Sequence, residues 1–340
     1  MLNIFYFRIQ NKMFFLFILF FSTLIAISSN SWLGCWIGME INLLSFIPLI
    51  SNCNNLMNSE ASLKYFLTQS IASITFLFII LIKLISIQNY LFNNFISLII
   101  NFSLLMKMGS TPFHFWFPNI VEGLSWFNNF ILMTWQKITP MILLSYYFNM
   151  IFLFLMAILN VMIGAIGGLN QTSLRKLMAF SSINNLGWMI VSIIISENLW
   201  FFYFFLYSFL ISIMCFLFYI TNMFFINQLF INNMNFMIKM NLMINFLSLG
   251  GLPPFLGFLP KWIIINFLMI NKLYLLTLIF ILSSLVILFF YIRIMYSCIM
   301  FNYLKMKWFK IFINNKLNFF SNFFSFISIL GMILSTFLYL

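Results

Sequence analysis

The chain has 340 residues, of which 64% are hydrophobic and 6% are charged, and its formal net charge is +12. Apolar runs of about 20 residues follow one another, which excludes a soluble domain and indicates a polytopic membrane protein. The basic residues form short clusters between these runs, so we interpret them as a topology signal and expect no nucleic-acid partner.

The apolar runs predict an all-α fold. Backbone polar groups need internal partners in lipid, and these runs are too long and continuous for the alternation of a membrane barrel. We expect a single membrane domain, residues 1–340, with about eleven crossings. The predicted crossings cover residues 11–29, 31–50, 60–86, 94–117, 124–147, 150–169, 174–195, 199–222, 240–268, 274–299 and 319–340.

Glu40 is the most informative residue of the second crossing. It is about the tenth residue of that helix, so it lies about 15 Å deep, near the centre of a hydrocarbon core about 30 Å thick. A charge at this depth costs about 2.5–3.5 kcal/mol, which favours a functional group. A fixed ion pair that serves only assembly is the alternative.

Three acidic residues lie nearer to the ends of the crossings. Glu60 and Lys64, spaced i,i+4 at a helix start near Ser59, predict a helix-stabilising ion pair. Glu122 and Glu197 are expected in solvated loops.

Glycine and proline interrupt the crossings at 94–117 and 240–268 with one shared spacing, G-x-x-P-F-x4-P. The repeat comprises Gly109, Pro112, Phe113 and Pro118 in the first copy, and Gly251, Pro254, Phe255 and Pro260 in the second. The copies lie five crossings apart, and an odd offset gives opposite orientations, as in the inverted broken helices of transporters. Two coincidental proline kinks are the alternative.

Four further titratable residues lie at or between these interruptions. Lys107 precedes the first one and is the expected partner of Glu40, whereas Lys261 directly follows the second. Either lysine could instead reach an interface. Lys137, near Thr134, Gln136 and Thr139, is the expected central proton carrier. His114 is a candidate relay or a hydrogen-bonded filler.

Other motifs indicate packing and not chemistry. Gly164 and Gly168 have the spacing of a helix-packing motif. Cys35, Cys53, Cys215 and Cys298 are widely separated and are interpreted as apolar core residues. We find no phosphate-binding loop, metal-ligand cluster or nucleophile triad, so we expect no cofactor, metal or redox site on this chain.

The basic clusters predict the topology. With the N-terminus inside, the inner side receives the clusters and the outer side receives little beyond Lys272 and Glu197. The inner clusters are Arg8 with Lys12, Arg175 with Lys176, Lys239, and the run Lys305, Lys307, Lys310 and Lys316. The bias toward Phe, Ile, Asn, Met and Tyr, without any Asp, is typical of an AT-rich gene and favours an organelle-encoded inner-membrane protein.

Several segments together resemble mitochondrial NADH dehydrogenase subunit 2, a family of antiporter-like membrane subunits of respiratory complex I, in an insect-like form. The segments are Trp32–Gly34, Met39–Asn42, Glu60–Phe66, Pro112–Pro118, Trp135–Lys137, Leu169–Ile183 and Leu249–Trp262. The last two are the most specific, and the resemblance extends over most of the chain.

The resemblance implies two inverted five-helix bundles, approximately residues 11–147 and 150–299, followed by a C-terminal helix at 319–340. It places Glu40, Lys107, Lys137 and Lys261 on a hydrated axis for proton translocation. Relatives often carry histidine where this chain has Asn185. Asparagine does not titrate, so a proton branch that needs that histidine is in question here.

The resemblance also implies partners and location. FMN, iron–sulfur clusters and ubiquinone are expected on other subunits, and the partners are the other membrane-arm subunits, accessory subunits and phospholipids such as cardiolipin. The expected location is the mitochondrial inner membrane, with the N-terminus in the matrix and the C-terminus in the intermembrane space. Two alternatives remain open, namely a purely structural bridging subunit and a free-standing ion/proton antiporter.

Overall fold

The computed structural model describes residues 2–52, 55–85, 90–232, 236–300 and 315–339. Cys53 and the basic residues Lys305, Lys307 and Lys310 lie outside the described residues. The chain divides into two units, residues 1–155 and 156–340, which are considered separately below.

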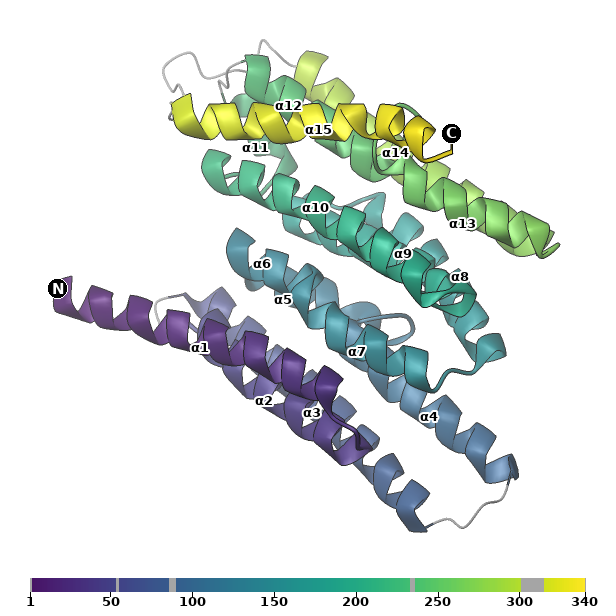
Figure 1. Cartoon of the computed structure of the whole chain (residues 1–340). Helices are drawn as coiled ribbons and strands as arrows, with labels where there is room; N and C mark the ends of the chain where they lie inside the picture. Colours follow the sequence, from purple (N-terminus) through teal and green to yellow (C-terminus); the bar gives the residue numbers. More distant parts are fainter. Residues whose placement is uncertain (1, 53–54, 86–89, 233–235, 301–314, 340) are drawn as a thin grey trace. The chain divides into compact units, whose positions relative to one another are not determined.

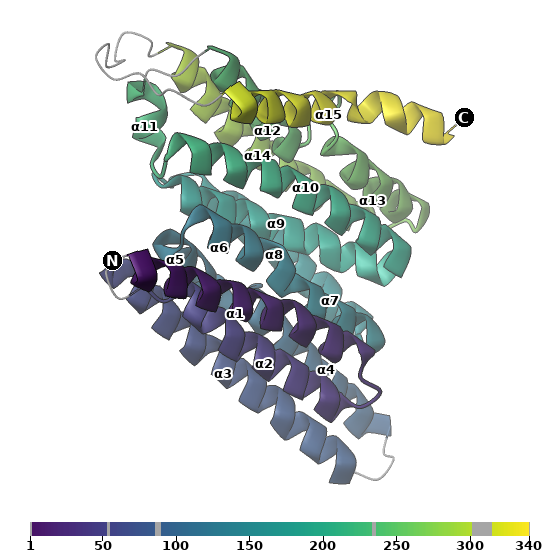
Figure 2. The ribbon, with the colours of Figure 1, turned by 60° about the vertical axis from the view of Figure 1, so that its left-hand side comes forward.

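Unit 1 is built from helices that pack as neighbours along the chain. Helix α1 packs on α2, α2 on α3, and α3 on α4 and α5, so that α1–α3 lie side by side in Figures 1 and 2. Helix α7 packs on α1 and α4. The elements are α1 (Leu2–Ser28), α2 (Trp32–Ile50), α3 (Leu56–Ile85), α4 (Tyr90–Met108), the 3-10 turn η1 (Phe113–Phe115), α5 (Trp116–Gly123), α6 (Trp126–Met133), α7 (Trp135–Tyr146) and the start of α8 (Met150–Gly168).

Unit 2 is centred on α9, of which almost every residue between Leu177 and Ile193 is buried. Helix α10 packs on α9, and α12 contacts α14 and α15. After the remainder of α8, the elements are α9 (Leu174–Ile195), α10 (Glu197–Thr221), α11 (Ile226–Ile231), α12 (Phe236–Gly250), α13 (Phe258–Ile270), α14 (Tyr274–Met300) and α15 (Asn315–Tyr339).

The all-α polytopic class predicted from the sequence is confirmed, since helices occupy each of the eleven predicted crossings. Within the described ranges, seven spans are long and apolar enough to cross a membrane, and shorter apolar helices lie in the predicted crossings at 11–29, 240–268 and 319–340. Among the described residues, the only β-type pairing is an isolated bridge between Ser173 and Phe225. One interruption was not predicted: the crossing at 124–147 is divided at Thr134 into α6 and α7.

The two G-x-x-P-F-x4-P copies form the same helix end. Gly109 and Gly251 both adopt positive φ, 73° and 83°. The N–H of Ser110 donates to the Leu105 carbonyl at 3.1 Å, and the N–H of Leu252 donates to the Leu247 carbonyl at 3.3 Å. A left-handed glycine with this back-bond is a helix stop. Each copy therefore ends one helix and lets another begin after the proline.

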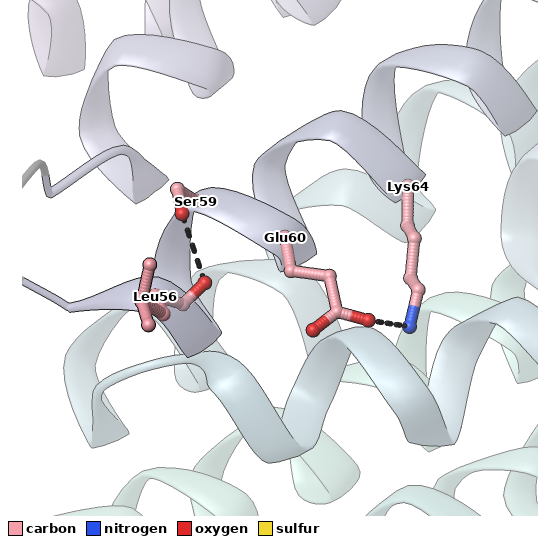
Figure 3. A network of polar contacts seen from close by, with 4 residues as sticks. All are labelled: Leu56, Ser59, Glu60 and Lys64. Carbon is pink, nitrogen blue, oxygen red and sulfur yellow. Dashed lines mark hydrogen bonds and ion pairs between the residues drawn. The ribbon is translucent and has the colours of Figure 1, made fainter.

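The structure agrees with the prediction for Glu60 but differs from it for Glu122 and Glu197. The Glu60–Lys64 ion pair is confirmed at 2.5 Å, between exposed side chains (Figure 3). Helix α3 begins earlier than predicted, at Leu56, so Ser59 lies inside the first turn and its hydroxyl donates to the Leu56 carbonyl. Glu122 is half-buried in the last turn of α5, and Glu197 is exposed in the first turn of α10, so the prediction of loops was wrong for both.

Candidate functional site

Unit 1 contains a small buried cavity lined by residues of α2 to α7. It offers about 20 Å³ to water centres, which is enough for a single water molecule. Lys107 and Lys137 both line it, and three amide side chains, Asn42, Gln69 and Gln136, share its wall. The cavity therefore combines two amines with the hydrogen-bonding side chains that a bound water needs.

Lys137 is the third residue of α7 and lies in its first turn, directly after the break at Thr134. Its side chain is 1% exposed, and its Nζ atom lies 5.3 Å from the centroid of the Phe117 ring. Pro140 lacks an N–H, so the Gln136 carbonyl one turn earlier loses its helical donor. The turn of α7 that carries Lys137 therefore contains a backbone carbonyl without its helical donor.

Lys107 occupies the last turn of α4, just before the left-handed Gly109. A helix carboxyl end carries partial negative charge, which favours a cation there. The buried Gln69 side chain on α3 donates to the Lys107 backbone carbonyl at 3.0 Å. The helix end that carries the ammonium is thus fixed to a neighbouring helix.

Glu40 is half-buried, and its Oε1 atom is buried without a hydrogen-bond partner among the described residues. Within the same part of the chain, no ion-pair contact of 4.0 Å or less joins Glu40 to Lys107. A buried carboxylate oxygen without a partner is expected to bind water.

The acid-bearing helix and the Lys137-bearing helix are joined beside these charges. Gln136, the residue before Lys137, donates from Nε2 to Oδ1 of Asn42 at 2.9 Å. Asn42 follows Glu40 by two residues on α2. Hydropathy alone predicts neither the Gln136–Asn42 contact nor the Gln69–Lys107 contact. The only sequence signal for either was an amide side chain inside an apolar helix.

His114 lies in the 3-10 turn after the first break and is buried. Its ring centroid is 4.2 Å from that of Phe115. The Nδ1 atom has no hydrogen-bond partner among the described residues, and the residue does not line the cavity of Lys107 and Lys137. The His114 side chain also hydrogen-bonds with the backbone of Pro112, so the interpretations as a relay and as a hydrogen-bonded filler both stay open.

Unit 2 contains a second cavity of the same size, about 20 Å³ for water centres, lined by Lys261, Asn185, Tyr203 and Tyr207. The Lys261 ammonium donates to the Gly250 carbonyl at 3.0 Å and to the Leu249 carbonyl at 3.5 Å. These carbonyls belong to the last turn of α12, before the second break. Lys261 is 5% exposed, and its ammonium points back to the carbonyls before the break.

No group of three or more His, Cys, Asp or Glu side chains is placed to hold a metal ion within the part of the chain that the structure describes. Cys35, Cys215 and Cys298 are buried free thiols. What the two cavities offer chemically is proton binding by lysine amines beside amide and hydroxyl groups that can donate and accept hydrogen bonds.

Known proteins resemble the chain in sequence and in fold. Residues 29–287 match the family described as NADH:quinone oxidoreductase/Mrp antiporter, TM. NADH-ubiquinone oxidoreductase chain 2 of Anopheles gambiae is 51% identical over 344 residues, covering 98% of this chain and 99% of the relative. The Aedes aegypti protein of the same name is 51% identical over 340 residues, with the same coverage.

The fold is similar to a chain in the structure of respiratory complex I from Thermus thermophilus with bound aureothin. The TM-score is 0.83 at 18% identity, covering 96% of this chain and 78% of that chain. Because the family match and the half-identical relatives extend over most of its length, the chain belongs to the NADH:quinone oxidoreductase/Mrp antiporter family, in its NADH-ubiquinone oxidoreductase chain 2 branch.

Proposed function

We propose that the chain is a core membrane-arm subunit of the proton-translocating NADH:ubiquinone oxidoreductase of the mitochondrial inner membrane. Glu40, Lys107, Lys137 and Lys261 carry the protons in this proposal, and His114 is a further relay. The observation that carries it is the burial of all three lysines at helix interruptions beside water-sized cavities. Amines kept at such depth without a transport role would be a net cost to insertion.

The shared cavity of unit 1 supports a transfer mechanism. Lys107 and Lys137 line one space of low dielectric, so protonation of both at once is opposed by charge repulsion. In this mechanism an ionised Glu40 favours a proton on Lys107, its expected partner, because opposite charges attract. When Glu40 is neutralised, that preference weakens and the proton is free to move to Lys137. From there it passes to Lys261, whose ammonium is held by two backbone carbonyls.

The remaining assignments are part of the same proposal. The redox reaction, with FMN, iron–sulfur clusters and ubiquinone, belongs to other subunits, and this chain supplies only the proton path. Its partners are the neighbouring membrane-arm subunits, accessory subunits and phospholipids such as cardiolipin. The N-terminus lies in the matrix and the C-terminus in the intermembrane space. Residues 11–147 and 150–299 are inverted half-repeats, which the matching geometry of Gly109 and Gly251 supports.

Lys137→Ala in assembled complex I tests the proton path against a scaffold role. We expect assembly on a native gel with NADH dehydrogenase activity in the band, but a lower proton-to-electron ratio in sealed vesicles. Lys64→Ala is the matched control, because it removes an exposed lysine whose i,i+4 pair is worth only about 0.2–0.5 kcal/mol.

Two outcomes would count against the proposal. A normal proton-to-electron ratio in the Lys137→Ala complex would remove Lys137 from the path. Reduced assembly with normal pumping per assembled complex would favour the purely structural subunit.

A further inference from the structure

Lys83, in the last turn of α3, lies between two aromatic side chains from other parts of unit 1. Its Nζ atom is 4.4 Å from the centroid of the Tyr147 ring and 5.4 Å from that of the Trp32 ring. The centroids of these two rings are 6.4 Å apart and the rings are inclined at 72°, so they form two walls beside the ammonium. Phe76 packs edge-on against the Trp32 ring and supports that wall. Cation–π attraction therefore holds the ammonium at a defined place.

The ammonium of Lys83 keeps hydrogen-bond donors that the described chain does not use. The side chain is half-buried, and it makes neither a hydrogen bond nor an ion pair among the described residues. An ammonium has three N–H donors, and ring faces are weak acceptors compared with an oxygen. The oxygen acceptors for these donors therefore come from outside the described part of the chain.

Positive charge is in excess at this end of unit 1. Trp32 is the first residue of α2, and α8 begins shortly after Tyr147, so the ammonium lies near helix amino ends that carry partial positive charge. The acidic residues of the unit lie elsewhere. Glu60 and Glu122 lie by the start of α3, at its other end, and Glu40 is about two turns further along α2. A bound anion would offset this excess.

The surroundings of Lys83 are those of a membrane interface. Lys64 and Lys83 are about 28 Å apart along the axis of α3, close to the thickness of a hydrocarbon core of about 30 Å. When the exposed Lys64 lies at one surface of the membrane, Lys83 therefore lies at the other, where Trp and Tyr are enriched. Leu84, Ile85 and Tyr146 are exposed beside it. An anion at the ammonium thus has apolar protein surface next to it.

We propose that Lys83, held between Trp32 and Tyr147, binds the phosphate of an anionic phospholipid at this end of unit 1. The ammonium donates to a phosphate oxygen, and the exposed side chains of Leu84 and Ile85 contact the acyl chains. This inference rests on the proposed function, because it gives the phospholipid partnership proposed there a site on this chain. A lipid fits better than a soluble anion, since its chains cover the apolar surface that surrounds the charge.

Lys83→Met in assembled complex I tests the site, because it removes the charge and keeps an unbranched side chain. The purified complex is reconstituted into phosphatidylcholine vesicles that contain a minor fraction of phosphatidylglycerol with a photoreactive diazirine in its acyl chain. Labelled peptides are quantified by mass spectrometry after illumination. We expect labelling of the peptides around Trp32, Lys83 and Tyr147 to fall by about fivefold, the loss expected for one lysine against an anionic headgroup.

Two variants control for the substitution itself. Lys83→Arg retains the charge and the cation–π contacts and should keep the labelling. Lys64→Met removes a lysine of the same helix that is already paired with Glu60, so labelling at the Lys83 end should not change. Equal losses in Lys83→Met and Lys83→Arg would overturn the role of the charge.

Two further arms identify the ligand. Excess inorganic phosphate should leave the labelling intact, and phosphatidylcholine with the same diazirine should label this end less than the anionic probe. Displacement by inorganic phosphate would make this a site for a soluble anion, and equal labelling by both lipids would remove the selection for negative charge. A wild-type complex without labelling at this end, as when a neighbouring subunit covers Lys83, would also overturn the lipid site.

Labelling is scored per assembled complex, which separates this inference from the proposed function. If Lys83→Met labels as the wild type does, the lipid site is wrong, while the proton-to-electron ratio of the same vesicles still tests the proton path. If the chain is missing from the band with NADH dehydrogenase activity on a native gel, the proposed function itself fails.

Discussion

At the residue scale, Lys107 and Lys261 illustrate two ways to hold an amine at a broken helix. Lys107 belongs to the last turn of α4, and its own helix end supplies the partial negative charge. Lys261 comes from the following helix, α13, and reaches back to the last carbonyls of α12. In both cases, backbone carbonyls offset part of the free energy that burying the ammonium costs. Because no carboxylate among the described residues is paired with the amine by a direct contact, the amine remains able to change its charge.

Gly251→Ala tests this arrangement at Lys261. Alanine at a φ of 83° is strained by about 1–2 kcal/mol, and its Cβ would lie 3.0 Å from Nζ of Lys261. We expect the ammonium to move away from the Gly250 carbonyl and the proton-to-electron ratio to fall in complexes that still assemble. The ratio is measured in sealed vesicles during NADH oxidation.

The neighbouring glycine provides the control. Gly250 is helical, and a Cβ there would meet its nearest atom, in Tyr291, at an ordinary 3.5 Å. Gly250→Ala should therefore leave pumping unchanged. Equal effects of the two substitutions would contradict the specific role that we assign to the Gly251–Lys261 contact.

At the element scale, α8 and α9 approach closely because each presents a glycine to the other. A Cβ on Gly164 would meet the backbone nitrogen of Asn184 at 2.6 Å, and one on Gly187 would meet the Ala157 carbonyl oxygen at 2.9 Å. Membrane helices associate through such small residues, since lipid offers no hydrophobic drive between them. Gly168, the other residue of the predicted packing motif, instead faces the Phe290 ring of α14.

Gly164→Ala should therefore separate α8 from α9, the helix that carries Asn185. Backbone atoms cannot move aside as a side chain can, so we expect a loss of about 1–3 kcal/mol and less assembled complex. The measurements are band intensity on a native gel and the temperature of half-inactivation. Ile166→Ala, on the exposed face of the same helix, is the control, and an equal effect there would argue against helix separation.

At the scale of the whole molecule, the sequence predicted helices well and contacts between helices poorly. Hydropathy located the crossings, and the glycine–proline spacing located both left-handed helix ends. The contact of Gln136 with Asn42 joins residues 94 positions apart, and that of Gln69 with Lys107 joins residues 38 apart. No local pattern encodes such pairs. The break at Thr134 was missed because no glycine or proline marks it.

The charge distribution of unit 2 predicts which of its ends faces the matrix. Arg175, Lys176 and Arg293 gather where α8 meets α9, whereas Lys272 and Glu197 lie at exposed positions near other helix ends. Because positive residues remain on the inner side, Lys272 should face the intermembrane space.

Lys272→Cys makes this orientation measurable, since the three described native cysteines are buried. A membrane-impermeant maleimide should label it in mitoplasts and not in inverted inner-membrane vesicles. Gln171→Cys, in the connection between α8 and α9, should give the opposite pattern. Labelling of the detergent-solubilised complex shows that each thiol is reachable. Labelling of both positions from the same side would contradict the topology, and a reversed pattern would place the basic end of unit 2 toward the intermembrane space.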